Sequence, residues 1–277
     1  MRIFLAGDNG KIKIIETLYI KKNDQAMRIF LADTNLRKCY CVEQQKLCRP
    51  YTLESFYYSD KATEEVLIPY SQDFMLDSGA FTFMQGRHDG RIAWEEYTDQ
   101  YADFVKRNKI QKYFELDIDS VIGYENVKIL RNRLHKYVGW QSIPVWHTGR
   151  GTDEFIRMSQ EFPYVAIGGL VGTGKSEYAR KYWNAFPWFI KTAHDNGAKI
   201  HALGFTSLDG LTRYHFDSVD STAWTTGNRF GFIYKFNGKT IEKIDCPKGK
   251  RLADSRLVAL INYTEWIKFQ QYAETHL

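Results

Sequence analysis

The stretch YVAIGGLVGTGKSEYARKYWNAFPWFIKTAHDNGAKIHALGFTS (164–207) predicts one strand, one helix and a second strand in succession. Its apolar runs at 164–172 and 199–207 end in glycine or small polar residues, and the segment 176–197 between them has the amphipathic pattern of a helix. A strand, a helix and another strand form the basic unit of parallel sheets. This stretch therefore predicts an α/β fold with parallel strands.

The same pattern recurs on both sides of this stretch. Further apolar runs are DFMLDSGAF (73–81), KYFELDIDS (112–120), SIPVWHTG (142–149) and YHFDSVDST (214–222), and AWEEYTDQYADFVKRN (93–108) has a helical pattern. Six runs, with one or two more strands expected nearer the N-terminus, approach the eight strands of a (β/α)8 barrel. A doubly wound open sheet is the alternative.

The positions of the chemically competent residues favour the barrel. In a barrel the active site is built from the carboxyl ends of several strands at once, whereas in an open sheet it gathers near one switch point. We therefore expect a single-domain TIM-like barrel over residues 1–277, since no linker or low-complexity segment divides the chain. The residues at the ends of the runs are Asp77, Asp117, Asp119, His147, Gly168, Gly169, Gly204 and Asp220.

Composition restricts the class of protein only broadly. The chain has 277 residues, 44% of them apolar, and a formal charge of +5, which is a mild preference for polyanionic partners. No apolar run has the length of a membrane span, and MRIFLAGDNG at the N-terminus lacks the long apolar stretch of a signal peptide. We expect a cytoplasmic protein without a membrane partner. The hexamer MRIFLA occurs at 1–6 and again at 27–32, which indicates two similar strands or a small local duplication.

In three of the apolar runs the apolar residues are followed by aspartate, which is a poor strand residue. A turn or a helix cap accounts for one such residue, but three at equivalent strand ends favour a common site. Converging carboxylates can attack or protonate at the C1 carbon of a sugar, where the transition state resembles an oxocarbenium ion. A carboxylate can also accept two hydrogen bonds from the N1–H and N2–H₂ edge of guanine. The same residue type therefore suits both glycosidic chemistry and guanine recognition.

Four motifs in order along the chain carry a family resemblance. They are LDSGAF (76–81), AIGGLVG (166–172), HALG (201–204) and FDSVDS (216–221), and together they resemble the motifs of the tRNA-guanine transglycosylases. The resemblance covers roughly residues 73–224. It implies a barrel enzyme that exchanges a guanine base in a nucleic acid.

The resemblance also implies roles for the aspartates. Asp220 is the expected nucleophile at C1′, and Asp77 is the expected general acid and base for the departing and incoming bases. Asp117 is expected to bind the guanine edge, with Asp119 as second choice because strand alternation puts both on one face. Asp217 lies three positions before Asp220, on the other face of a straight strand, so we expect it to have a structural or supporting role.

A second group of residues is implied to hold the base. Gly168, Gly169 and Leu170 would present backbone groups to it, and Phe81 and Leu203 would lie against its two faces. His147 stands where the family has glutamine and would donate to the O6 oxygen, or it is simply a buried, hydrogen-bonded histidine. Ser78 of the LDSGAF motif completes the expected substrate-binding group.

The chain departs from the family in its cysteines. The family has a C-terminal zinc site, but after Asp220 this chain has only Cys246. Cys39, Cys41 and Cys48 read C-x-C-x₆-C, which is not the usual paired spacing of a zinc site. We therefore expect no zinc subdomain, no bound metal and no cofactor.

Other departures change the expected substrate. Ala80 replaces the second glycine of the family motif, and Thr222-Ala223-Trp224 replaces its Pro-Thr-Arg. The strings SVDSTAW (218–224) and ESFYY (54–58), with the short chain, resemble the phage and bacterial relatives that insert 7-deazaguanines into DNA. The expected partners are therefore DNA, with tRNA as the alternative, and a 7-deazaguanine base such as preQ0, together with a second copy of the chain or a helper protein. A phage-encoded protein would act in the host cytoplasm. Candidate contacts to the phosphate backbone are KGKR (248–251), Lys106, Arg107, Lys109 and Lys112.

Three rival functions remain open on the sequence. GLVGTGKS (169–176) matches the phosphate-binding loop G-x₄-G-K-[ST], which predicts a nucleoside-triphosphatase, although KIHALGF (199–205) offers no following magnesium-binding aspartate. A glycoside hydrolase would use the same carboxylates with water as the acceptor. A barrel that binds nucleic acid without catalysing a reaction is the non-enzymatic alternative.

Overall fold

A computed structural model shows how these segments are arranged. It describes residues 2–6, 12–16, 26–33, 40–80, 82, 92–169, 183–205, 207–248 and 254–277. Of the residues with expected roles, Phe81, Leu170 and the rest of the GLVGTGKS loop after Gly169 lie outside this part of the chain. Cys39 and residues 249–251 also lie outside it.

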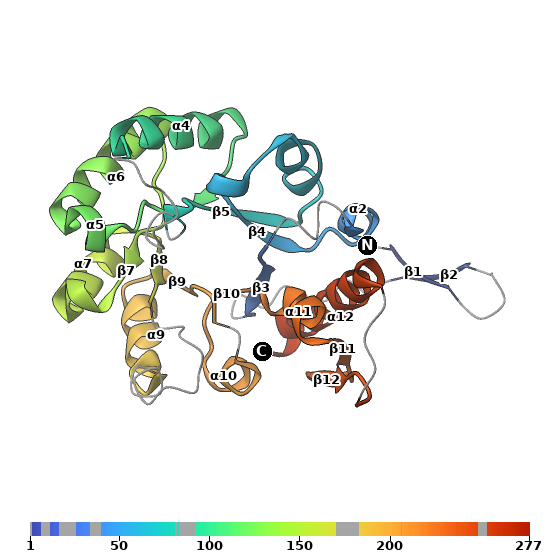
Figure 1. Ribbon diagram of the computed structural model, residues 1–277. Helices are drawn as coiled ribbons and strands as arrows, with labels where there is room; N and C mark the ends of the chain where they lie inside the picture. The colour runs from blue at the N-terminus through green and yellow to red at the C-terminus, as the bar shows by residue number, and fades with distance from the viewer. Residues whose placement is uncertain are drawn as a thin grey trace.

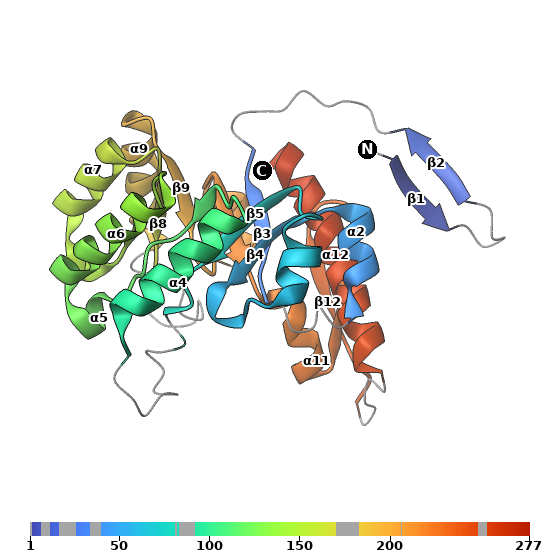
Figure 2. The ribbon, with the colours of Figure 1, turned by 90° about the horizontal axis from the view of Figure 1, so that it is seen from above.

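Eight parallel strands form one sheet in the order β6-β5-β4-β3-β10-β9-β8-β7. Along the chain, β3 is the first strand of the barrel and β10 is the last. These two strands pair along their length, from Ser218 opposite Arg28 to Ser221 opposite Leu31. A parallel bridge between Phe114 and Ile143 joins the ends of β6 and β7 and closes the circle. This is a (β/α)8 barrel, as the sequence predicts, and Figures 1 and 2 show helices around it. The strands are β3 (Arg28–Leu31), β4 (Tyr51–Ser55), β5 (Asp73–Asp77), β6 (Lys112–Tyr113), β7 (Val145–Trp146), β8 (Tyr164–Ile167), β9 (Lys199–Ala202) and β10 (Ser218–Ser221).

Helices and short helical turns connect the strands. In α4, buried residues at positions 98, 101, 102 and 105 form one stripe against the sheet, the spacing that an α-helix requires. The helices and turns are α2 (Val42–Cys48), η1 (Phe56–Tyr58), η2 (Thr63–Leu67), α4 (Trp94–Arg107), α5 (Asp119–Ile122), α6 (Tyr124–Val138), η3 (Thr148–Arg150), α7 (Thr152–Glu161), α9 (Phe186–Asp195), α10 (Leu208–Arg213), η4 (Ala223–Thr225), α11 (Thr226–Phe230) and α12 (Ser255–His276).

The barrel interior is filled by alternate residues of the strands. Phe30, Met75, Phe114, Val145 and Ala166, each from a different strand, are completely buried in one cluster. Their chain neighbours point outward into the layer between the sheet and the helices. Because side chains alternate along a strand, the residues two positions after Met75, Val145 and Ala166 also face the barrel axis, nearer its carboxyl end.

The C-terminal helix α12 closes a gap in the barrel wall. β3 and β4 are in register at only one pair, Leu31 opposite Thr52. Gln270 of α12 fills the space below this pair: its Oε1 accepts from the Tyr51 N–H at 3.0 Å, and its Nε2 donates to the carbonyl oxygens of Ile29 at 2.5 Å and Tyr51 at 3.0 Å. A side chain thus takes the place of missing backbone hydrogen bonds between two strands.

Two β-hairpins lie outside the barrel sheet. β1 (Arg2–Ala6) pairs with β2 (Ile12–Glu16), and β11 (Phe232–Phe236) pairs with β12 (Ile241–Asp245) beside α12 (Figure 1). The repeated hexamer MRIFLA thus supplies two strands, as expected, one in the first hairpin and one in the barrel. Within the described ranges, no helix has both the length and the apolar character needed to cross a membrane.

Candidate active site

The residues expected to act lie at the carboxyl end of the barrel. Asp77 is the last residue of β5, Asp220 is the third of four in β10, and His147 and Gly168 follow β7 and β8 directly. Asp77, His147 and Gly168 come two positions after the buried interior residues Met75, Val145 and Ala166. Strand alternation therefore turns them toward the barrel axis, as the sequence pattern predicts.

Asp77 lies beside two other carboxylates. The pKa of Asp77 is raised to about 7, first by burial, then by the neighbouring Asp117, and to a smaller extent by Asp220. The backbone N–H of Gly79 donates to its Oδ2 at 2.9 Å and partly offsets these effects. A carboxyl group with a pKa near neutrality can both give and take a proton at physiological pH.

The turn that holds Asp77 needs a glycine. Gly79 has a φ of +79°, and a Cβ there would lie 2.5 Å from Cβ of Tyr57 and 2.9 Å from Oγ of Ser55. Any other residue would therefore be strained and would collide with the end of β4. The glycine of the LDSGAF motif thus lets the loop fold back and place its N–H on the carboxylate.

Asp220 is almost completely buried, at 7% exposure, and is held through one oxygen. Its Oδ1 accepts from the backbone N–H of Gly204 at 2.5 Å and lies 3.2 Å from Nε2 of His201. Oδ2 accepts no hydrogen bond from the described residues, so this oxygen is left to meet a substrate. Gly204, at a φ of +65°, makes the turn after β9 that points its N–H inward.

His201 is a site residue that the sequence reasoning missed. It is completely buried on β9, with its ring centroid 5.2 Å from that of Phe114 and 6.3 Å from that of Phe30. The signal was present in the alternation of β9, which puts His201 and Leu203 on the same face as the barrel interior. In the motif HALG (201–204), the family resemblance points only to Leu203 and Gly204.

Asp117 and His147 form a pair beside Asp77. Nε2 of His147 lies 3.1 Å from Oδ2 of Asp117. The ring of His147 packs against Gly168 and Gly169, where a Cβ would come within 2.8 Å and 3.2 Å of it. If Nε2 donates to Asp117, Nδ1 of a neutral ring carries no proton, so His147 would donate to a base only as an imidazolium.

Asp119, the second choice for guanine recognition, is committed elsewhere. Its two oxygens accept from Nε and Nη2 of Arg150, both at 2.6 Å, and the guanidinium is 1% exposed. Nη1 of Arg150 donates to Glu115 at 2.7 Å, and Glu115 also accepts from the Val145 N–H at 2.8 Å. This buried network replaces a strand-to-strand hydrogen bond where β6 and β7 diverge. Of the two aspartates, the structure places Asp117 beside Asp77.

The remaining expected residues divide into two groups. Leu203 is partly buried against the interior cluster at the barrel mouth. Ser78 is completely buried, and its Oγ accepts from the Ala80 N–H at 3.3 Å, so its hydroxyl serves the loop rather than the mouth. The structure therefore brings Leu203 to the site and does not bring the Ser78 side chain there.

Asp217 lies at the other end of the barrel, as its expected supporting role requires. Its Oδ2 accepts from the Ile200 N–H at 2.8 Å and lies 2.9 Å from Nε2 of His194. These contacts tie the start of β10 to the start of β9 and to the end of α9. Asp217 and Asp220 are three positions apart in sequence but serve opposite ends of the same strand.

The basic residues of 106–112 do not lie at the mouth. They occupy the end of α4 and the start of β6, which is the amino end of the barrel. Lys112 pairs with Asp73 at the first residue of β5, and Arg107 pairs with Glu64. Helix α4 therefore carries this cluster to the end of the barrel opposite the candidate active site, and its contact with a nucleic-acid backbone stays a prediction. Lys248 is exposed, and residues 249–251 lie outside the described residues.

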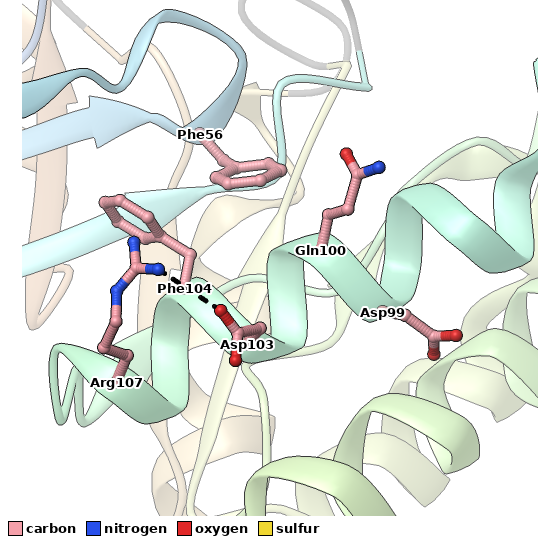
Figure 3. A pocket seen from close by; sticks show the side chains of 6 residues that line it. All are labelled: Phe56, Asp99, Gln100, Asp103, Phe104 and Arg107. Atoms are coloured by element: carbon pink, nitrogen blue, oxygen red, sulfur yellow. Dashed lines mark hydrogen bonds and ion pairs between the residues drawn. The ribbon is translucent and has the colours of Figure 1, made fainter.

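A surface depression of about 440 Å³ lies beside α4 (Figure 3). Phe56 and Phe104 form its apolar wall, and Asp103 pairs with Arg107 at 3.3 Å on its rim. None of the three clustered aspartates lines it. It is therefore separate from the candidate active site.

The described residues offer no metal centre: they contain no group of three His, Cys, Asp or Glu side chains arranged to hold an ion. Cys48 and Cys246 are free thiols. No family model matches the chain, and no curated protein sequence matches it. The class therefore rests on the fold and the site: a (β/α)8 barrel with three aspartates gathered at its carboxyl end.

Proposed function

We propose that this protein is a guanine transglycosylase that exchanges guanine in DNA for a 7-deazaguanine base. The observation that carries the proposal is the pair Asp77 and Asp220. The first has a pKa raised to about 7, and the second has one oxygen, Oδ2, that accepts no hydrogen bond from the described residues. A double displacement at a sugar carbon requires two groups. One gives and takes a proton near neutral pH, and the other is a carboxylate held in a fixed position.

The reaction has two displacements. Oδ2 of Asp220 attacks C1′, the bond from C1′ to the base breaks, and the departing guanine takes the proton of Asp77. The incoming base then loses a proton to the Asp77 carboxylate and attacks C1′, and the ester bond to Asp220 breaks. Two inversions give overall retention, and Asp77 returns to its protonated form. The target nucleotide must leave the stack first, because a duplex shields its glycosidic bond.

Asp117 supports the choice of guanine. It lies close enough to Asp77 to raise the pKa of that group, so it borders the same space. A carboxylate there can accept from the N1–H and N2–H₂ groups of guanine, while Leu203 lies against the ring. The preference for DNA over tRNA comes from the departures of the chain from the tRNA-modifying relatives, namely the missing zinc ligands and the SVDSTAW string.

Base exchange tests the proposal. Purified protein would be incubated with radiolabelled guanine and with single-stranded DNA, duplex DNA or bulk tRNA, and label retained in polymer would be counted. We expect label in DNA and not in tRNA. Label in tRNA alone would support the tRNA alternative. Release of base from the polymer without incorporation of label would indicate a hydrolase that uses water as the acceptor, and ATP hydrolysis without exchange would indicate the GLVGTGKS loop.

A matched pair of variants tests whether base exchange depends on Asp220. Asp220→Asn should abolish exchange, because an amide cannot form the ester. Asp217→Asn changes the same residue type just before β10, at the opposite end of the barrel, and its amide oxygen can still accept from the Ile200 N–H. It should exchange at the wild-type rate. Equal losses in both variants would contradict the assignment.

A further inference from the structure

A chain of hydrogen bonds runs down the barrel interior from Asp220. Nδ1 of His201 lies 2.5 Å from Oγ of Ser218, and the same Oγ lies 2.5 Å from the hydroxyl of Tyr164. His201 and Ser218 are completely buried. The chain therefore links Asp220, at the carboxyl end, with Tyr164 at the first residue of β8, on the amino side of the barrel.

The direction of this chain follows from the nucleophile. An ionised Asp220 can only accept, so Nε2 of His201 must donate to it. A neutral imidazole then has a bare Nδ1, so the Ser218 hydroxyl must donate to Nδ1 and the Tyr164 hydroxyl must donate to Ser218. Each group has one proton to give, and each proton has one acceptor. Only one tautomer of His201 satisfies every member.

We propose that His201 is the positioning residue of the nucleophile, fixed as the Nε2–H tautomer by Ser218 and Tyr164. This inference rests on the proposed function. With the Gly204 N–H, Nε2–H holds Oδ1 of Asp220 from two sides and so fixes the rotation of the carboxylate. Oδ2 is then aimed at the barrel mouth before substrate arrives. His201 does not touch substrate, and it acts only through Asp220.

The aromatic surroundings fit a positioning role. Phe30 and Phe114 flank the imidazole ring, so the ring is held on two sides by rigid neighbours from other strands. A locked ring gives the hydrogen bond to Asp220 a fixed direction, and a nucleophile held in its reactive geometry needs less reorganisation in the transition state. The same histidine on a flexible loop would not provide this.

Variants of His201 separate positioning from folding. His201→Leu removes the donor, and we expect kcat for base exchange to fall about 10–100-fold, the range seen for outer residues that orient a reactive group, with KM changed less than about threefold. His201→Gln can place an amide N–H near the Nε2 position and should recover part of the lost kcat. His201→Leu with wild-type kcat would overturn the proposal.

A second measurement does not depend on activity. The ¹⁵N spectrum of histidine-labelled full-length protein should show His201 as the Nε2–H tautomer in the wild type. Ser218→Ala should weaken that preference and lower kcat by a smaller factor than His201→Leu. A His201 ring protonated at Nδ1, alone or together with Nε2, would overturn the proposal even if His201→Leu fails to fold. If the wild type shows the expected tautomer but exchanges no base, the proposed function fails and the geometry of the chain stands.

Discussion

Asp77 links the chemistry of the site to the stability of the fold. Its pKa is raised from 3.8 to about 7 in the folded protein, so the folded state binds this proton more tightly than the unfolded chain does. The stabilising effect of the proton is therefore complete below pH 3.8 and is lost as the pH rises through about 7. The group that we propose as the acid thus destabilises the protein at alkaline pH.

The variant Asp77→Asn tests this linkage. The free energy of unfolding of the wild type, minus that of the variant, should fall between pH 5 and pH 7, with a slope of at most about 1.4 kcal/mol per pH unit. It should level off above pH 8. Urea unfolding at several pH values measures this difference, and the subtraction cancels the titrating groups that do not interact with Asp77. A difference that is constant with pH would show that Asp77 has an ordinary pKa.

Gly168 shows how a single hydrogen atom shapes the site. A Cβ at this position would lie 2.8 Å from Cε1 of His147 and 2.8 Å from Cγ1 of the completely buried Val145. Gly168→Ala should displace His147 and destabilise the protein by about 1–3 kcal/mol. Gly149→Ala is the control, because nothing lies within 4 Å of its Cβ. Thermal melts and exchange rates of the two variants would measure this, and equal behaviour would contradict the packing argument.

The residues at strand ends could be predicted from sequence, whereas their partners could not. Asp77, His147, Gly168 and Asp220 follow apolar runs, and a parallel barrel brings all such ends to one side. His201 lies inside an apolar run. Without knowledge of the neighbouring strands, a polar residue there indicates only a break in the apolar pattern. The role of His201 depends on its hydrogen bonds with Asp220 and Ser218 of β10. Which strand lies beside β9 is set by the fold and cannot be obtained from the run itself.

The join between β6 and β7 depends on a buried ionic network. Glu115 is completely buried and accepts from Arg150, from Arg131 and from the backbone of β7. Arg150 also lies 4.1 Å from the ring centroid of Tyr124. Removing one partner leaves an uncompensated buried charge, which is far more costly than the loss of an exposed pair.

Two arginine variants test this element. Arg150→Met should destabilise the protein by about 3–5 kcal/mol, because it removes both charged hydrogen bonds to Asp119 and leaves Glu115 with Arg131 as its one guanidinium partner among the described residues. Arg133→Met breaks a comparable two-pronged pair with Asp99, but those side chains are 44% and 41% exposed, so the loss of stability should be much smaller than that of Arg150→Met. Urea unfolding compares the two. Similar small costs would mean that β6 and β7 are held by other contacts.

The outer parts of the chain complete the barrel as a whole. The expected eight strands appear because two strands before residue 73, β3 and β4, join the six apolar runs. The role of α12 could not be predicted, since its pattern indicates only a buried helix. Gln270 reaches two strands more than 200 residues earlier in the chain, at separations of 219 and 241 residues. Closure of the barrel therefore requires its C-terminal end.

Substitution of Gln270 tests this long-range closure. Gln270→Leu leaves the Tyr51 N–H and two carbonyl groups without this partner, and each unsatisfied buried group costs about 1–3 kcal/mol. Gln271→Leu changes the adjacent residue, whose side chain makes no hydrogen bond with the described residues, and should alter stability by about 0.5 kcal/mol or less. Denaturant midpoints of both variants would show the difference. Equal midpoints would mean that the barrel closes without α12.

The mass of the protein after reaction with DNA gives the sharpest test of the proposed chemistry. Wild-type protein incubated with guanine-containing single-stranded DNA and no incoming base, then denatured, should carry a covalent nucleic-acid adduct on the peptide that contains Asp220. Asp217→Asn should carry the same adduct, and Asp220→Asn should carry none. An adduct on another residue, or base exchange by Asp220→Asn, would contradict the assignment of Asp220 as the nucleophile.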